Sequence, residues 1–138
     1  MPKYFIDTNI FFYAKIMDRK YGRSCAKILQ ALSEGKIDGI ISSLILLEVA
    51  NALSKYGLVR EVKPVLTSIP ALPVVIQSID SLDVKKAVEI FHSYRVSPYD
   101  CTHAAVMLRE GISNIISADY DFDRMKEVVR TDPLKFRI

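Results

Sequence analysis

The chain has 138 residues, half of them hydrophobic and a quarter charged, which excludes a disordered or low-complexity protein and predicts one domain over residues 1–138. A formal charge of +3 suits a nucleic-acid partner without requiring one. No apolar stretch is long enough to span a membrane, and Cys25 and Cys101 are too far apart for a Cys-x-x-Cys motif, so we expect a soluble, cytoplasmic protein with reduced cysteines.

The first predicted element is a short strand over residues 4–6, which ends in an acid, a hydroxyl and an amide. Asp7 follows this apolar stretch directly, and its charge is costly to bury unless a partner compensates it. A helix-capping role explains Asp7 equally well from the residue alone. Thr8 and Asn9 suit the N-cap of a helix that we expect over residues 10–16.

A polar turn over residues 18–23 follows, with Gly22 in it and several basic residues around it. Such a cluster can contact a nucleic-acid backbone, but it is also typical of a solvated face. A second helix is predicted from Ser24, and a strand over residues 37–41 follows it. The residues that we predict to contact nucleic acid are Lys15, Arg19, Lys20 and Arg23.

The next helix is predicted over residues 44–56, where apolar residues recur at helical spacing between a Ser42 or Ser43 cap and a stop at Gly57. Glu48 interrupts the most apolar part of this helix. Its carboxylate either lies on an exposed polar stripe or is held inward for a purpose, and the sequence leaves both interpretations open.

Residues 61–69 predict a helix interrupted near Pro64, followed by a strand over residues 74–76. A further helix is expected from Asp80 or Ser81 to Tyr94, with its charged residues facing water. We expect its apolar residues to pack against the rest of the protein: Leu82, Val84, Ala87, Val88, Ile90 and Phe91.

A last long helix is predicted to begin at Ser97-Pro98-Tyr99-Asp100 and to end by Gly111. Asp100 lies in its first turn, where the helix dipole favours an acid for purely structural reasons. His103 lies one turn later, either as a packed and hydrogen-bonded residue or as a supporting partner of Asp100.

Acids at alternating positions follow the next predicted strand, which covers residues 114–117. Asp119 comes directly after this strand, as Asp7 comes after the first one. Asp121 is either a further contributor to a site or a helix cap, and Asp123 is expected at the surface. A final strand is predicted over residues 128–130.

Alternating strands and helices predict an α/β sandwich with a mostly parallel sheet, in which sites form beyond the carboxyl ends of the strands. Asp7 and Asp119 lie at such ends, and the helices carrying Glu48 and Asp100 can flank them. Four carboxylates at one place need compensating positive charge. All-oxygen ligands select Mg²⁺ or Mn²⁺, and one or two such ions can activate water to attack a phosphodiester.

The sequence resembles the PIN-domain nucleases over nearly its whole length, and it resembles their VapC-type toxin ribonuclease branch more closely. The resemblance lies in the order and spacing of four segments: residues 6–9 (IDTN), 47–53 (LEVANAL), 100–105 (DCTHAA) and 117–123 (SADYDFD). It implies a three-layer α/β/α fold, a Mg²⁺- or Mn²⁺-dependent endoribonuclease that acts on RNA, a frequent homodimer and an antitoxin protein as partner.

The resemblance also implies roles for particular residues. Asp7 and Asp100 are the expected direct metal ligands, and Asn9 and Ser117 are expected to support the site through hydrogen bonds. Asp121 can still be either a contributor to the site or a helix cap. The four acids that the resemblance assigns to catalysis and metal binding are Asp7, Glu48, Asp100 and Asp119.

Two other functions remain open from the sequence. One is a catalytically silent PIN module that binds metal and RNA or a partner protein without hydrolysing anything. The other is a phosphotransfer enzyme with Asp7 as the phosphate acceptor. The second is disfavoured, because no acid lies two residues after Asp7 and no suitable lysine follows a late strand.

Overall fold

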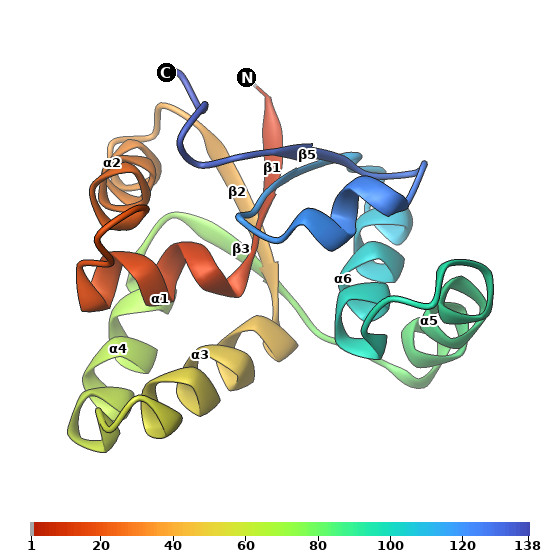
Figure 1. The fold of residues 1–138 in the computed structure, drawn as a ribbon, viewed down its shortest axis with the longest axis horizontal. Coiled ribbons are helices and arrows are strands. Elements are labelled where there is room, and N and C mark those ends of the chain that lie inside the picture. The colour runs from red at the N-terminus through yellow and green to blue at the C-terminus, as the bar shows by residue number, and fades with distance from the viewer. Residues whose placement is uncertain (1) are drawn as a thin grey trace.

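The computed structural model describes residues 2–138 and contains a five-stranded parallel sheet (Figure 1). Its strands are β1 (Lys3–Ile6), β2 (Asp38–Ser42), β3 (Val74–Gln77), β4 (Asn114–Ile116) and β5 (Val129–Thr131). They lie in the order β3-β2-β1-β4-β5, and every neighbouring pair is parallel. The predicted α/β architecture with a mostly parallel sheet is therefore confirmed.

Helices cover both faces of this sheet, as Figure 1 shows. On one side lie α1 (Thr8–Ile16), α2 (Gly22–Ser33), α3 (Ser43–Lys55) and α4 (Val59–Ala71). On the other side lie α5 (Ser81–Tyr94) and α6 (Pro98–Arg109), and a short 3-10 helix, η1 (Tyr120–Arg124), follows β4. The result is a three-layer α/β/α sandwich. Within residues 2–138, none of the helices has the length and apolar character needed to cross a membrane.

The strand order reverses between β1 and β4. From β1 the chain moves outward through β2 to β3, then returns to the other side of β1 with β4 and β5. Such a reversal opens a crevice beyond the carboxyl ends of the two strands at which it occurs. Asp7 directly follows β1 and Ser117 directly follows β4, so both lie at this crevice.

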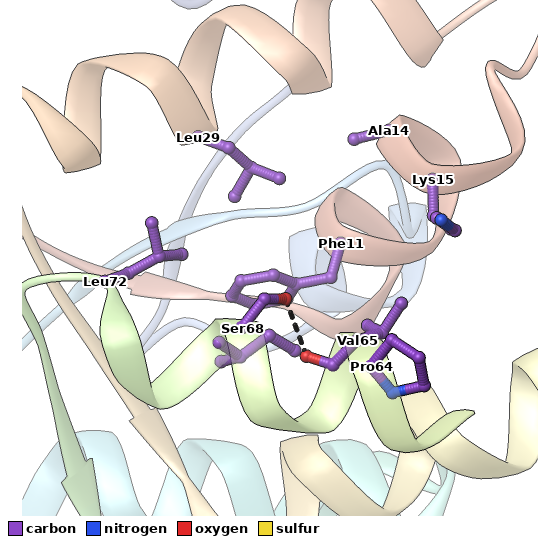
Figure 2. Close-up of a pocket in the computed structure, with 9 residues that line it drawn as sticks. Phe11, Ala14, Lys15, Leu29, Pro64, Val65, Ser68 and Leu72 are labelled. Atoms are coloured by element: carbon purple, nitrogen blue, oxygen red, sulfur yellow. Dashed lines mark hydrogen bonds between the residues drawn. The ribbon is translucent and has the colours of Figure 1, made fainter. Parts of the chain in front are cut away.

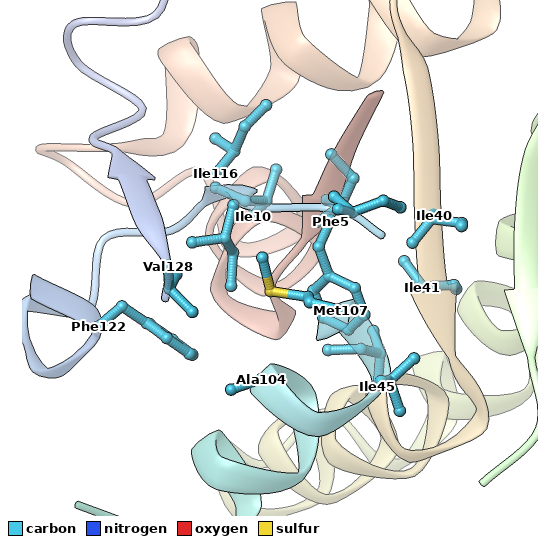
Figure 3. Close-up of a cluster of buried hydrophobic side chains, with 14 of the residues drawn as sticks. Phe5, Ile10, Ile40, Ile41, Ile45, Ala104, Met107, Ile116, Phe122 and Val128 are labelled. Carbon is cyan, nitrogen blue, oxygen red and sulfur yellow. The ribbon is translucent and has the colours of Figure 1, made fainter. Parts of the chain in front are cut away.

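The hydrophobic core fills the space between the sheet and its helices. Phe5, Ile41, Ile45 and Met107 are fully or almost fully buried there (Figure 3). The central strands carry uninterrupted apolar runs because helices cover both of their faces. The two cysteines, Cys25 and Cys101, are buried and free, as the sequence predicts.

Several predicted boundaries differ from the structure. The N-cap of α1 is Asp7 rather than Thr8 or Asn9, and α2 begins at Gly22 instead of Ser24. The predicted break near Pro64 is wrong, because α4 runs through this residue. Pro64 cannot donate a hydrogen bond to the carbonyl of Arg60, and its ring crowds that carbonyl, but Arg60 is exposed, so water can take the place of the missing donor.

The prediction for the apolar face of α5 is wrong in part. Asp83 is buried on the inner side of this helix, where the guanidinium of Arg109 in α6 donates to both of its carboxylate oxygens at 2.9 and 3.1 Å. This ion pair fixes the rotation of α5, so that Ala87 and Ile90 also face inward. The outer side therefore carries exposed apolar residues that were expected to pack: Leu82, Val84 and Val88.

Gly22 allows α2 to start very close to the end of α1. A Cβ atom at this position would lie 2.7 Å from the carbonyl carbon of Met17 and 2.9 Å from its Cα. Backbone atoms cannot rotate away, so we predict that Gly22→Ala lowers the free energy of unfolding by about 1–3 kcal/mol. The greater helix propensity of alanine, worth about 1 kcal/mol, should not offset this loss.

Urea unfolding measures this difference, and Lys27→Ala, an exposed change in the same helix, is the matched control. A Gly22→Ala protein as stable as the wild type would show that the α1–α2 turn tolerates a side chain here.

Candidate metal centre

Asp7 lies at the carboxyl end of β1 with only 4% of its surface exposed. Its Oδ1 accepts the backbone N–H of Thr8 at 2.8 Å, and its Oδ2 accepts the hydroxyl of Ser117 at 2.5 Å and the amide of Asn9 at 3.0 Å. Burial raises the pKa of Asp7, although the charge of His103 and these hydrogen bonds oppose the increase. The carboxylate is thus fixed in position and poorly solvated, so a nearby cation would stabilise its ionised form.

Asn9 and Ser117 join the ends of β1 and β4 around Asp7. The amide of Asn9 also donates to the Ser117 hydroxyl at 3.1 Å, and its carbonyl oxygen accepts the N–H of Ala118 at 3.1 Å. The Ser117 oxygen in turn accepts the N–H of Asp119 at 3.0 Å. Both residues lie beside the acids, where hydrogen-bonding support was predicted, and they connect Asp7 to the segment that carries Asp119.

Glu48 points inward from α3. Its Oε1 accepts the hydroxyl of Thr8 at 2.7 Å and lies 2.6 Å from Nε2 of His103, which is fully buried. Burial alone would raise the pKa of Glu48, but the hydrogen bond and charge of His103 and the Thr8 hydrogen bond lower it below its usual value. Of the two interpretations that the sequence allows, the inward one is therefore observed.

The sequence does not reveal how Thr8 and His103 contribute to the site. Thr8 was expected as a cap, and His103 was weighed as a packed residue or a partner of Asp100. The structure places His103 within 4.8 Å of both Asp7 and Glu48, measured between potential ligand atoms. A histidine one turn after an acid in α6 was the available signal, but the contact with α3 depends on tertiary packing.

Asp100, Asp119 and Asp121 form the other side of the site. Asp100 lies in the first turn of α6, and one carboxylate oxygen from each of these three acids lies within 4.8 Å of the others. Burial raises the pKa of Asp100 to about 8, and the negative charges of Asp7, Asp119 and Glu48 add to the effect. The charges of Asp7 and Glu48 reach Asp100, so the two groups of acids lie within electrostatic reach of each other.

The three acids after β4, Asp119, Asp121 and Asp123, have different roles. Asp119 caps η1 by accepting the N–H of Asp121 at 2.9 Å, and it also belongs to the acidic group. Asp121 lies in the same group. Asp123 is exposed and paired with Arg130, as expected for a surface residue.

These residues fit a hard divalent cation. The carboxylates of Asp7, Glu48, Asp100, Asp119 and Asp121 supply oxygen donors, and the Nε2 atom of the nearby His103 is already engaged by Glu48. Oxygen donors of this kind select Mg²⁺ or Mn²⁺. The high pKa of Asp100 is due first to burial and then to neighbouring negative charges, and a divalent cation would compensate those charges.

Two of the basic residues around the α1–α2 turn, Lys15 and Lys20, have different neighbours. Lys15 pairs with Glu61 of α4 at 2.9 Å and borders an apolar groove of about 480 Å³ between α1, α2 and α4 (Figure 2). Lys20 instead lies over the ring of Tyr21, 5.1 Å from its centroid. The groove has no acid among its lining residues and is distinct from the acidic site. RNA contacts by Lys15, Arg19, Lys20 and Arg23 stay a prediction.

The chain matches one protein family in sequence and several solved structures in fold. The PIN domain profile matches residues 4–128, whereas no curated protein matches the chain significantly. Similar solved structures include VapC20 of Mycobacterium tuberculosis, described as a toxin that cleaves the sarcin–ricin loop, with 17% identity and a TM-score of 0.73 over 90% of this chain and 97% of that one.

Two structures of complexes are also similar. VapBC2 of Rickettsia felis, bound to a DNA fragment from its promoter, has 19% identity and a TM-score of 0.70. A toxin–antitoxin complex from Klebsiella pneumoniae has 20% identity and a TM-score of 0.65. Each alignment covers 94% of this chain and 97% of the other. At these identities the likeness concerns the fold.

The raised pKa of Asp100 predicts how stability depends on pH without metal. In EDTA, stability should fall as the pH rises from about 4 to about 8, because the folded protein keeps a proton on Asp100 that the unfolded chain has released. Asp100→Asn removes this contribution. At pH 8 the variant should be more stable than the wild type by on the order of 3 kcal/mol, with little difference near pH 4.

Thermal and urea unfolding at several pH values test this expectation, with the exposed Asp38→Asn as control. Added Mn²⁺ should stabilise the wild type and the control but not Asp100→Asn. An equal response to Mn²⁺ in all three proteins would show that Asp100 is not a ligand.

Proposed function

The chain belongs to the PIN domain family, and from this premise we propose that it is a nuclease, specifically a Mg²⁺- or Mn²⁺-dependent endoribonuclease that acts as the toxin of a toxin–antitoxin pair. We also propose that residues 1–138 act as one domain. The proposal is supported by two groups of acids from distant segments, which lie close enough for Asp7 and Glu48 of one group to act on Asp100 of the other. One or two ions would be held by Asp7, Glu48, Asp100 and Asp119, with Asp7 and Asp100 as direct ligands.

A bound Mg²⁺ or Mn²⁺ supplies an activated water and neutralises charge on the leaving oxygen of a phosphodiester. The protein contributes fixed geometry. Ser117 and Asn9 hold the Oδ2 atom of Asp7, while Thr8 and His103 hold the Oε1 atom of Glu48. Burial and the neighbouring negative charges raise the pKa of Asp100, and a cation held by these acids would favour its ionised form.

We propose that the substrate is RNA. A phosphate backbone that binds at the acidic site needs basic residues nearby to hold it. Arg19, Lys20 and Arg23 are exposed in or next to the α1–α2 turn, and Lys15 lies in the last turn of α1. The similar VapC20 is described as a toxin that cleaves the sarcin–ricin loop, an RNA target, which supports the choice of RNA over DNA. We place this activity in the cytoplasm.

The metal ligands can be tested through Asp7. Asp7→Asn keeps the shape of the side chain but weakens the negative field that holds the ion. We predict that it lowers the rate of Mn²⁺-dependent RNA cleavage roughly a thousandfold, because metal catalysis is worth several kcal/mol. Asp38→Asn should cleave like the wild type. Cleavage that survives in EDTA, or in Asp7→Asn, would contradict the proposal, as would RNA binding with no cleavage of any RNA.

The proposed partners are an antitoxin protein encoded next to this chain and a second copy of the chain itself. Two of the similar structures support this proposal, since they are VapBC2 of R. felis and a toxin–antitoxin complex. We predict that the purified product of an adjacent reading frame forms a stable complex with the protein and suppresses its Mn²⁺-dependent cleavage. Light scattering and cleavage assays measure both effects. A free monomer whose cleavage no adjacent product changes would remove the toxin–antitoxin part of the proposal.

A further inference from the structure

Tyr120 carries an exposed aromatic ring in the short segment that holds Asp119 and Asp121 of the acidic site. It lies between Asp119 and Asp121 at the start of η1, and 61% of its surface is exposed. Asp119 already caps this helix, so Tyr120 is not needed for that role. The apolar ring is in contact with water, and a molecule that binds at this position would cover it.

One face of the Tyr120 ring is covered by Arg130. The Cζ atom of Arg130 lies 4.5 Å from the ring centroid, within the range of a cation–π contact. Two nitrogens of the guanidinium donate to Asp123, each at 3.0 Å, and a third donates to the carbonyl of Ser117 at 2.9 Å. The Arg130 side chain is only 8% exposed, so it is a fixed support, and the exposed area of Tyr120 belongs to its opposite face and edge.

The side of the site next to α1 and α2 carries further rings and a cation. Tyr13 and Tyr21 stack with 5.1 Å between their centroids and 10° between their planes, and the ammonium of Lys20 lies 5.1 Å from the Tyr21 centroid. The pKa of Lys20 is raised chiefly by Tyr21 and further by Tyr120, which places Lys20 within electrostatic reach of the exposed ring. Lys20, seated over the Tyr21 ring, therefore brings a positive charge within electrostatic reach of Tyr120.

We propose that the exposed face of Tyr120 is a nucleobase-binding subsite, on which one base of the RNA stacks while Lys20 contacts a neighbouring phosphate. The inference rests on the proposed nuclease function and deepens it by assigning a base contact next to the scissile phosphate. Every base has a π face, so this contact holds a nucleotide that is unstacked from its neighbours without selecting its identity. Arg130 positions the ring from behind and does not touch the RNA.

Binding of a fluorescein-labelled eight-nucleotide RNA, measured by anisotropy in EDTA, tests this subsite without cleavage. Tyr120→Leu should weaken binding about 5- to 100-fold, the range for the loss of one base–aromatic stack, whereas Tyr120→Phe should bind within about twofold of wild type. Tyr56→Leu is the matched control, because Tyr56 is 60% exposed at the end of α3, outside the acidic site. Mn²⁺ affinity, measured by calorimetry, should be the same in all of these proteins.

A second series of RNAs with a single abasic position separates stacking from a structural effect. In the wild type one abasic position should weaken binding, and in Tyr120→Leu that position should make no further difference. Equal binding by wild type and Tyr120→Leu would overturn the subsite and leave the nuclease proposal intact, as would equal losses in Tyr120→Leu and Tyr120→Phe, which would assign the effect to the hydroxyl. A wild-type protein that neither binds nor cleaves RNA would overturn both proposals.

Discussion

Mutual repulsion between carboxylates at one edge of the sheet is the constraint on which the rest of the structure depends. Asp7, Glu48, Asp100 and Asp119 come from four distant parts of the chain, and their charges act on one another there. A fold gains nothing in stability from such an arrangement, because poorly solvated like charges oppose ionisation. A bound cation would compensate this repulsion.

The protein holds these acids in place by giving them different local partners. Asp7 is held by hydrogen bonds from β4 and the start of α1, and Glu48 is stabilised as an anion by Thr8 and His103. Asp100 instead has a pKa raised by burial and by the neighbouring negative charges, which favours its protonated form. Fixed anions beside a carboxyl group with a raised pKa form a site at which added positive charge is favourable.

Much of the site is local in sequence and could be predicted. Asp7 and Asp119 were found because each follows an apolar strand, and a parallel sheet brings such ends together. The contacts of Glu48 with Thr8 and His103 could not be predicted, because they depend on how α3 and α6 pack. The rotation of α5 was missed for the same reason, since an ion pair between Asp83 and Arg109 outweighs its apolar pattern. The break at Pro64 was predicted from the rule that proline interrupts a helix. The rule fails here because the carbonyl that loses its partner belongs to an exposed residue and can bind water.

The most direct test of the central claim is a crystal structure grown with Mn²⁺, in which anomalous scattering locates the ion. We predict a peak beyond the carboxyl ends of β1 and β4, coordinated by oxygens of Asp7 and Asp100, with Glu48 and Asp119 bound to it directly or through water. No peak there at a saturating Mn²⁺ concentration, or a peak only at surface acids such as Asp123, would contradict the claim that these carboxylates form one metal site.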